Sequence, residues 1–498
     1  MRELLLGLDI GTSACKAAVF HSDGEVIATE SKSFPVHHPQ RGYAEQDPND
    51  WWDAVSYCTR KMFAEKKVSP HEIAAIGIDG QSWAAVPVDK NGMCLCNSPL
   101  WMDTRAKDIC NEVNNKIGAK NIFSISGNPL KPGYTTPKVI WYKKNLPEIY
   151  SRISKILQSN GYIAFMLTGE LTQDISQGYG WHCFDMRKGT WSYDTARELG
   201  IDTRLLPDIF PCDKVIGGVT KSASSETGLI EGTPVVAGGL DAACGALGVG
   251  VIREGEAQEQ GGQAGGMSIC LKDYAAEENL ILSFHVVPDK WLLQGGTTGG
   301  GGVIRWFTDQ FCTGESKREI FAEINSLAEK IPAGSEGLIF LPYMSGERTP
   351  IWDTDAKGVF YGIDFSKTKG HFIRSCMEGT AYSLKHNLVT AERAGAYVDE
   401  LRAMGGSANS HLWTQIKADV TGKTITVPSS DTATTFGAAI LAGVGAGIYS
   451  GYDDAVNKTV KIKRTHEPNK NNEEVYARNY DTYRAIYESL KHIMKSHN

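Results

Sequence analysis

The segment LLLGLDIGTS, residues 4–13, decides the fold of this chain. Its short apolar run ends in Asp9, and Gly11-Thr12-Ser13 follows as a tight turn. A second apolar stretch, residues 15–20, leads to an Asp-Gly turn at residues 23–24 and a third short stretch. Runs of strand-forming residues bounded by Gly and Asp predict a three-stranded β-meander.

A helix and a buried strand are expected after this meander. Asp47-Pro48-Asn49-Asp50 has the composition of a helix start, and apolar residues recur behind it at three- and four-residue spacing. Residues 73–78 are apolar and end in Asp79-Gly80-Gln81, as a buried strand would. Strands and helices in this order predict an α/β domain with a mixed sheet.

The rest of the chain continues the α/β rhythm. Residues 256–260 and 267–271 form a second strand–turn–strand unit that weakly echoes the first, which hints at a duplicated fold. We expect two domains, residues 1–250 and 251–498. We also expect strands at 235–237, 337–341 and 400–404, helices at 155–168, 372–394, 410–421 and 435–447, and a polar loop at 465–472 before a terminal amphipathic helix.

Composition excludes several classes of protein. The 498 residues are 41% hydrophobic and 22% charged, which is typical of a soluble globular protein. The net charge is −7 and no long basic run occurs, so neither nucleic acid nor a membrane is an expected partner. The 11 cysteines contain no CxxC pair, and residues 436–449 are too short to span a membrane. We also expect no signal peptide, because the first residues lack a long apolar run. We therefore expect a cytoplasmic protein with reduced thiols.

Asp9 and the turn behind it have the residue types of a phosphate–metal site. Backbone N–H groups and the hydroxyls of Thr12 and Ser13 suit phosphate oxygens, and a carboxylate can hold the accompanying cation. Lys16 would add positive charge. An ordinary hairpin that contains an Asp is the alternative reading.

Two later glycine-rich turns also carry candidate residues. Asp241 follows an apolar strand and Gly238-Gly239, where it could accept a proton from a substrate hydroxyl or simply cap a helix. Gly405-Gly406-Ser407-Ala408-Asn409 follows another strand and could let a base or phosphate approach the backbone, or form a plain turn.

Other nucleotide and metal motifs are missing from the sequence. Gly422-Lys423-Thr424 matches the end of a Walker A motif, but Lys417 stands where its first Gly is required. No GxGxxG and no HExxH occurs. A P-loop, a dinucleotide fold and a tight zinc site are therefore disfavoured.

Taken in order, these segments resemble the FGGY family of carbohydrate kinases, with the xylulokinases as the most similar branch. The resemblance covers nearly the whole chain and rests on the motifs that follow: residues 7–13, 43–48, 78–81, 101–105, 138–141, 341–350 and 358–362 with His371, Ser375 and Glu378.

The resemblance implies two actin-like, ribonuclease H-like α/β lobes with a deep interlobe cleft, sugar mainly on the first lobe and ATP with Mg²⁺ mainly on the second. It implies that Asp9 serves the metal and that Asp241 is the catalytic base. The implied nucleotide-binding residues are Thr12, Ser13, Lys16, Gly262, Gln263, Gly405, Gly406, Ser407 and Asn409. The implied substrate-binding residues are Gln81, Ser82, Trp83, Asp103, Arg105 and Ala242. Dimers are common in the family, so a homodimer is one expectation.

Three departures bear on the substrate. Ser82-Trp83 replaces the usual Met-His, Ala242 replaces an Asn, and Gly262-Gln263-Ala264-Gly265 replaces a Gly-Thr-Ser-Gly phosphate loop. The expected function is phosphorylation of a ketopentose such as D-xylulose by ATP. Loss of hydrogen-bonding groups can redirect specificity, which leaves another polyol or ketose (ribulose, gluconate, glycerol or a signalling furanone) as an alternative. The altered phosphate loop leaves an actin-like ATP-binding protein without phosphotransfer as a third reading.

Overall fold

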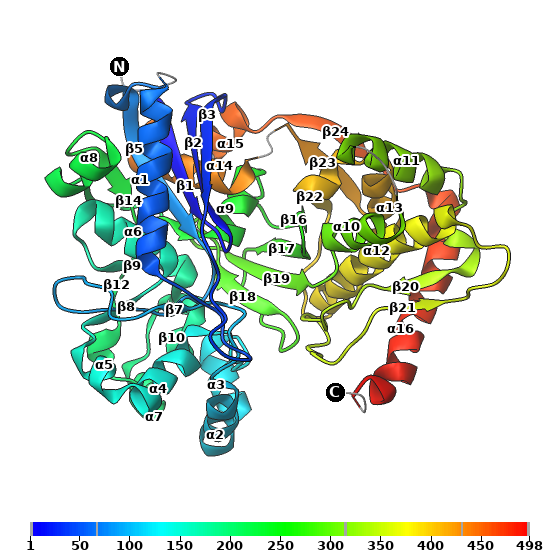
Figure 1. Ribbon diagram of the computed structural model, residues 1–498, viewed down its shortest axis with the longest axis horizontal. Helices are drawn as coiled ribbons and strands as arrows, with labels where there is room; N and C mark the ends of the chain where they lie inside the picture. Colours follow the sequence, from blue (N-terminus) through cyan, green and yellow to red (C-terminus); the bar gives the residue numbers. More distant parts are fainter. Residues whose placement is uncertain (1–2, 66–67, 313–315, 430–431, 496–498) are drawn as a thin grey trace.

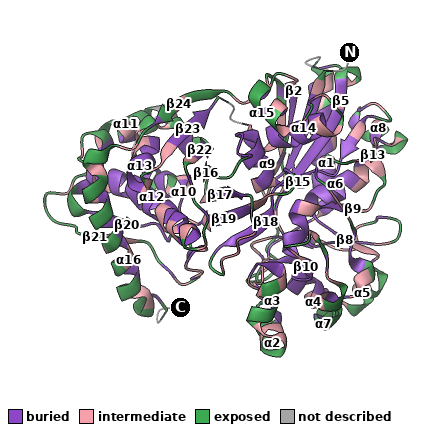
Figure 2. Ribbon diagram, turned by 180° about the vertical axis from the view of Figure 1, so that it is seen from behind, coloured by how far each residue is buried: buried purple, intermediate pink, exposed green. Residues whose placement is uncertain are grey.

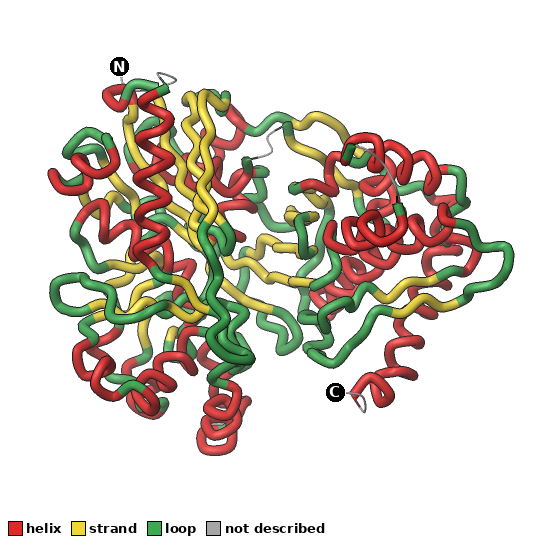
Figure 3. Tube along the Cα trace, in the orientation of Figure 1, coloured by secondary structure: helices red, strands yellow, loops and turns green. Residues whose placement is uncertain are grey.

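The computed structural model describes residues 3–65, 68–312, 316–429 and 432–495. Two large mixed β-sheets lie side by side, each with helices packed on it, and the first half of the chain forms most of one layered body (Figure 1). The tube view follows the same two bodies, with long helices clustered around the second sheet (Figure 3).

The first sheet carries the segment that decides the fold. β1 lies at its centre, antiparallel to β2 and parallel to β5. Its strands run in the order β13-β14-β5-β1-β2-β3, with β15 also paired to β5. Their bounds are β1 Leu4–Ile10, β2 Ala14–His21, β3 Val26–Ser33, β5 Ile73–Gly80, β13 Val215–Gly218, β14 Pro234–Val236 and β15 Gly239–Leu240.

Helix α14 (Ala433–Gly445), from the far end of the chain, packs on this first sheet. A Cβ on Gly7 of β1 would lie 1.9 Å from the carbonyl oxygen of Thr435, and a Cβ on Gly77 of β5 would lie 1.8 Å from that of Ala438. The helix backbone therefore rests directly on the strands. Figure 2 shows α14 as a buried element between its neighbours.

The second sheet repeats the meander-like opening. β16 is antiparallel to β17 and parallel to β22. The order is β18-β19-β17-β16-β22-β23-β24. Their bounds are β16 Glu256–Gly261, β17 Gly265–Leu271, β18 Ile281–Phe284, β19 Trp291–Thr297, β22 Glu400–Met404, β23 Thr424–Pro428 and β24 Ile462–His466.

The remaining elements cover the two sheets and connect them. The helices are α1 Pro48–Ala64, α2 Lys107–Ile117, α3 Ala119–Ser126, α4 Thr135–Asn145, α5 Pro147–Arg152, α6 Ser159–Thr168, α7 Tyr193–Glu198, α8 Lys221–Thr227, α9 Asp241–Gly248, α10 Gly301–Phe311, α11 Lys317–Glu329, α12 Lys369–Arg393, α13 His411–Thr421, α15 Tyr452–Thr459 and α16 Glu473–Lys495. The described part of the chain also contains five two-stranded ladders: β4 Glu45–Gln46 with β7 Ser98–Pro99, β6 Val86–Val88 with β8 Lys155–Leu157, β9 Thr172–Asp174 with β12 Asp208–Phe210, β10 Phe184–Asp185 with β11 Thr190–Trp191, and β20 Ile339–Leu341 with β21 Val359–Tyr361.

The structure confirms the α/β class and most of the expected elements, with three differences. The expected helix at 155–168 begins only at Ser159, because residues 155–157 pair as β8 with β6. The strand expected at 337–341 begins at Ile339, after a 3₁₀ turn at Ser335–Gly337. The expected loop at 465–472 begins inside β24, which pairs with β23. In each case a long-range strand partner or a local turn overrides the local pattern.

The domain division at residue 250 stays a prediction, since α14 of the second half packs against the first sheet. Within the described ranges, no helix has the length and apolar character that a membrane crossing requires.

Candidate active site

The turn after β1 presents a carboxylate with polar neighbours from both halves of the chain. Asp9 is buried at the strand end, and the hydroxyl of Thr434 at the start of α14 donates to its Oδ2 over 3.0 Å. The Lys16 ammonium lies 3.7 Å from the same oxygen and is itself largely exposed. An oxygen donor of this kind, beside a glycine turn, fits the coordination preference of Mg²⁺.

Thr12 joins the turn to the expected sugar side. Its hydroxyl donates to Gln81 Oε1 over 3.3 Å and accepts from the indole N–H of Trp101 over 3.0 Å. Gln81 is buried, and its amide also donates to Gln46 over 3.1 Å. Gln81 therefore holds the turn after β1 through its side chain. Ser13 beside it is exposed, with its hydroxyl region open to a ligand.

Asp241 is the first residue of α9. The N-cap of this helix is Leu240, so Asp241 does not cap it. Its Oδ1 accepts from the N–H of Ala242 over 2.6 Å. Burial and the nearby Asp9 carboxylate raise the pKa of Asp241 to about 7. A carboxyl group that titrates near neutral pH suits proton transfer. Its helix contacts α14 on one side and β16 and β17 of the second sheet on the other, so Asp241 lies where the two sheets approach.

Asp79 is a third carboxylate at this place that sequence reasoning did not select. It lies fully buried at the end of β5, and within the described ranges no donor group reaches either oxygen. Burial, Asp9 and Asp241 raise its pKa strongly. The signal was present in the sequence, because residues 73–80 repeat the pattern of an apolar strand that ends in Asp-Gly.

Ser82 and Trp83 begin an aromatic wall. The hydroxyl of Tyr179 donates to Ser82 Oγ over 2.7 Å, and the Trp83 ring stacks on Tyr134 with ring centroids 3.9 Å apart. Trp83 adopts a left-handed backbone conformation with φ 60°, and no described residue accepts from its buried indole N–H. A strained backbone and an unused donor are features that accumulate at binding sites.

Asp103 and Arg105 bind each other. Arg105 Nε donates to both oxygens of Asp103 over 3.0 and 2.9 Å, and its Nη2 contacts Glu45 over 2.6 Å. The guanidinium lies 3.9 Å from the ring centre of Tyr43. These contacts use much of the hydrogen-bonding capacity of both side chains, so their expected contact with sugar stays a prediction, as does that of the half-buried Ala242.

Lys138 of α4 connects three loops that lie beside these aromatic residues. Its fully buried ammonium donates to the carbonyls of Trp83 over 2.8 Å, Leu100 over 2.7 Å and Gly133 over 2.7 Å. Burial lowers the pKa of Lys138 to about 7, while the three carbonyls favour the charged ammonium. Nothing in the sequence marked this residue beyond its place in a family motif.

The second half of the chain brings its two glycine loops together. The β16–β17 turn and the loop after β22 are neighbours because Gln260 pairs with Met404 in the parallel register. A cavity of about 470 Å³ opens beside them. Of the expected nucleotide residues it is lined by Gly262, Gln263, Gly406, Ser407 and Asn409, whereas Gly405 lies against the backbone of Gly261.

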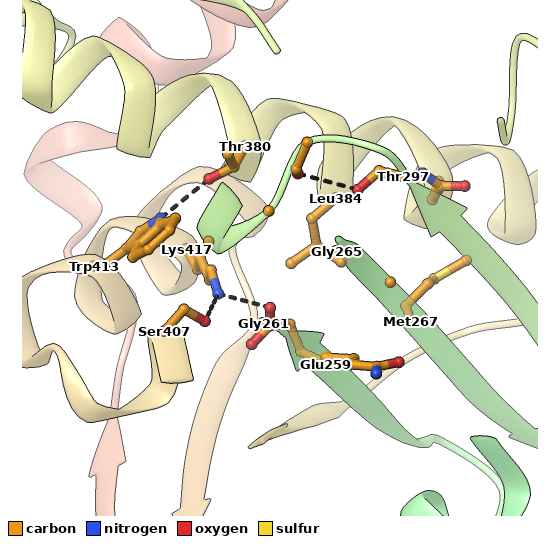
Figure 4. Close-up of a pocket in the computed structure, with 16 residues that line it drawn as sticks. Glu259, Gly261, Gly265, Met267, Thr297, Thr380, Leu384, Ser407, Trp413 and Lys417 are labelled. Atoms are coloured by element: carbon orange, nitrogen blue, oxygen red, sulfur yellow. Dashed lines mark hydrogen bonds and ion pairs between the residues drawn. The ribbon is translucent and has the colours of Figure 1, made fainter. Parts of the chain in front are cut away.

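A buried ion pair lies in a small pocket that adjoins this cavity and shares Ser407 and Trp413 with it (Figure 4). Lys417 Nζ lies 2.6 Å from Glu259 Oε1 and donates to Ser407 Oγ over 2.7 Å. The Trp413 indole donates to Thr380 over 3.1 Å and forms part of the wall. The pair fixes α13 to β16 and holds Ser407 in place.

Gln263 packs on the glycine-rich start of α10. The N–H of Gly301 donates to Gly262 O over 2.7 Å and the N–H of Gly302 to Gln263 O over 2.9 Å. The first N–H groups of α10 therefore face the loop that replaces the usual phosphate loop. These two N–H groups are used within the protein, so they hold this loop against the start of α10.

Two mixed sheets, a carboxylate at their junction and a cavity beside paired glycine loops define a two-lobed kinase fold of the actin-like ATPase class. Family models agree: that of the N-terminal domain of the FGGY family of carbohydrate kinases matches residues 4–248, and that of its C-terminal domain matches residues 271–446. The chain belongs to the FGGY family of carbohydrate kinases.

Similar proteins cover the whole chain. A xylulose kinase of Staphylococcus epidermidis is 33% identical over 99% of this chain and 98% of that protein. A gluconokinase of Bacillus subtilis is 27% identical over 100% of this chain and 97% of that protein. The crystal structure of xylulose kinase from Rhodospirillum rubrum superposes with a TM-score of 0.89 at 28% identity, covering 99% of this chain and 100% of that one.

Proposed function

We propose that this carbohydrate kinase transfers the γ-phosphoryl group of ATP to a primary hydroxyl of an open-chain ketopentose, with D-xylulose as the first candidate. The observation that carries the proposal is the full-length similarity to xylulose kinases, 33% identical in one case. The position of Asp241 between the two sheets supports phosphotransfer rather than nucleotide binding alone. We expect the enzyme to act in the cytoplasm, with a homodimer as the expected assembly.

Asp241 would orient the accepting hydroxyl and take its proton. Its pKa of about 7 leaves a substantial carboxylate fraction at neutral pH. The position of Asp241 in the first turn of α9 adds the positive end of the helix, which favours negative charge at the reacting centre. Positioned acid–base groups of this kind contribute roughly 10²- to 10⁴-fold to rate.

Asp9 would hold Mg²⁺, and Thr12, Ser13 and Lys16 would contact phosphate oxygens. A bound Mg²⁺ would supply charge neutralisation for the transferring phosphoryl group. Gly262, Gln263, Gly406, Ser407 and Asn409 would line the nucleotide site across the junction, in the cavity of about 470 Å³. Closure of the halves would exclude water and limit futile hydrolysis.

Gluconate is a second candidate substrate. The gluconokinase of Bacillus subtilis aligns over the whole chain, and Trp83, which stacks on Tyr134, stands where the family resemblance has a hydrogen-bonding group. A site that loses such groups can change its preference among hydroxylated substrates by orders of magnitude.

A coupled assay of ADP release tests the function. D-xylulose, D-ribulose, D-gluconate and glycerol are supplied in turn with ATP and Mg²⁺, and the phosphorylated hydroxyl is identified by ³¹P-coupled NMR. We expect the largest kcat/KM for D-xylulose. A larger kcat/KM for D-gluconate would identify gluconate as the substrate instead. If no sugar raised ADP release, the protein would be an ATP-binding protein without phosphotransfer.

A further inference from the structure

Arg348 reaches the sugar side of the site from the second half of the chain. It lies in the segment between β20 and β21, and its guanidinium lies 5.1 Å from the ring centre of Trp101. It also lies against β19, where a Cβ on Gly296 would be 2.5 Å from Nη2. The glycine there leaves room for this side chain.

The Arg348 guanidinium has no acceptor among the residues that the structure describes. The obvious candidate, the neighbouring Glu347 carboxylate, instead accepts from the N–H of Thr298 over 2.7 Å and from the N–H of Arg348 over 2.8 Å. Burial lowers the pKa of Arg348. A guanidinium carries five N–H donors, and because Arg348 is only half-buried these donors remain accessible to a ligand.

The groups that face this cation belong to the predicted sugar wall. Trp101 donates its indole N–H to Thr12 of the phosphate turn. Tyr134 and Tyr179 lie near enough to Arg348 that its positive charge acts to lower the pKa of both hydroxyl groups. Tyr134 also stacks on Trp83. Arg348 is therefore an unused donor that faces the sugar wall across the junction of the two halves.

We propose that Arg348 is a sugar-binding residue supplied by the second half, and that its guanidinium donates to a planar oxygen of the substrate. This inference rests on the proposed function. The chemistry it recognises is either the carbonyl oxygen of an open-chain ketose or the carboxylate of an aldonate. Both match the fork of an arginine better than an isolated hydroxyl does.

This role also links substrate binding to the approach of the two halves. Trp101 and Trp83 belong to the first body and Arg348 to the second, so a sugar held by both connects them. A ligand can favour a closed arrangement only through contacts that it makes better in that arrangement. Arg348 supplies such a contact.

The test uses the full chain with Arg348→Met and Arg348→Lys. Arg187→Met is the matched control, because its guanidinium also lies over an aromatic ring, that of Tyr274 at 3.9 Å, and belongs to no part of the site. KM values for sugar and ATP are measured together with thermal unfolding, with and without sugar and in the absence of nucleotide.

For Arg348→Met we expect the KM for D-xylulose to rise about 10- to 100-fold, the size expected when hydrogen bonds from a charged donor are lost. The KM for ATP should stay within about twofold, and the unliganded unfolding midpoint should change little, because the Arg348 side chain gives up only its contact with the Trp101 ring and no hydrogen bond or ion pair. The stabilisation by sugar should disappear. Arg348→Lys should lie between wild type and Arg348→Met, and Arg187→Met should match wild type.

A comparison of three ligands identifies the oxygen that accepts from Arg348. D-xylulose offers a ketone, D-gluconate a carboxylate and xylitol hydroxyls only, so the arginine-dependent thermal shift should be large for one of the first two and small for xylitol. An equal loss for xylitol would overturn the assignment of a planar oxygen. Unchanged sugar KM values, or an unliganded midpoint that falls while both KM values rise, would overturn the role of Arg348. Absence of sugar-dependent ADP release in the wild type would instead refute the proposed function, and the thermal shifts would still report on Arg348.

Discussion

Asp9 and Asp79 lie side by side on neighbouring parallel strands, at the point where β1 and β5 end. Their surroundings differ. Asp9 receives a hydrogen bond from Thr434 and has the Lys16 ammonium nearby, whereas Asp79 is fully buried with no donor from the described residues. Two carboxylates in such proximity do not both ionise easily, so the pair favours Asp79 as the protonated acid, able to donate to Asp9.

The free energy of unfolding of Asp79→Asn should therefore rise relative to that of the wild type as the pH increases. The folded state holds a proton on Asp79 that the unfolded state releases above its ordinary pKa near 3.8. The free energy of unfolding of the wild type must then fall by up to about 1.4 kcal/mol for each pH unit, because of this one group. Asparagine does not titrate, so the variant should not show this pH dependence. Urea unfolding at pH 5, 6, 7 and 8 measures the difference.

Asp174→Asn is the control, because Asp174 is equally buried but accepts from Ser176, from Asn160 over 2.8 Å and from the N–H of Gln177 over 3.1 Å. An amide there disrupts an acceptor network and should destabilise at every pH. A stability difference between Asp79→Asn and wild type that stays constant from pH 5 to 8 would show that Asp79 is ionised in the folded protein.

Asp241→Asn should lower kcat by about 10²- to 10⁴-fold with little change in the KM for ATP. The pKa of Asp241 is raised to about 7, so the acid form predominates below that pH and cannot take a proton. Wild-type kcat/KM for sugar should therefore fall about tenfold per unit as the pH drops below 7. The residual activity of the variant should lack this slope, and a wild-type profile flat between pH 5.5 and 8 would remove Asp241 from the role of base.

Gly437→Ala should destabilise the protein and lower its activity together. Gly437 lies in α14, where a Cβ would be 1.8 Å from the carbonyl oxygen of Cys244 in α9, the helix that begins with Asp241. Alanine favours a helix over glycine by about 1 kcal/mol, but overpacking costs roughly 1–3 kcal/mol, so the clash decides the sign.

Gly451→Ala is the control for Gly437→Ala, because nothing lies within 4 Å of a Cβ there and its φ of 161° is extended backbone. Thermal unfolding and kcat are measured for both variants. A Gly437→Ala protein with wild-type stability would mean that α9 and α14 do not approach as closely as the structure has them.

The sequence was sufficient for elements whose signals are local. β1, β2 and β3 follow from apolar runs punctuated by Gly11 and Gly24, because turn residues act on their immediate neighbours. The strand at 155–157 was wrongly expected to be helical because its pairing partner, β6, lies about seventy residues earlier. Docking of α14 on the first sheet also depends on partners far apart in the chain, so its helical pattern alone could not predict it.

The candidate site divides in the same way. Asp9 and Asp241 stand at strand ends beside glycines, a pattern that can be read directly from sequence. Asp79 carries the same pattern, but its significance comes from lying beside Asp9 across the sheet. Arg348 shows no local pattern, because what distinguishes it is the absence of an acceptor in the folded protein, and only packing determines that.

Lys138→Met should weaken sugar binding without weakening nucleotide binding. The ammonium of Lys138 joins the carbonyls of Trp83, Leu100 and Gly133, which belong to three loops around the aromatic wall. Methionine fills similar space but leaves the three carbonyls without their donor, and each unmet buried group costs about 1–3 kcal/mol. The wall should loosen, with a sugar KM raised roughly tenfold or more, a lower unfolding midpoint, and a KM for ATP close to wild type.

Lys143→Met is the matched control for Lys138→Met, because Lys143 lies on the same helix and donates only one exposed bond, to Gly200 O over 2.7 Å. It should change neither KM. Since the cavity proposed for the nucleotide is lined by residues of β16, α10 and α13, a disturbance confined to the first body should not reach it. Equal increases in both KM values would mean that Lys138 supports the whole fold, and unchanged values would mean that the three loops keep their positions without it.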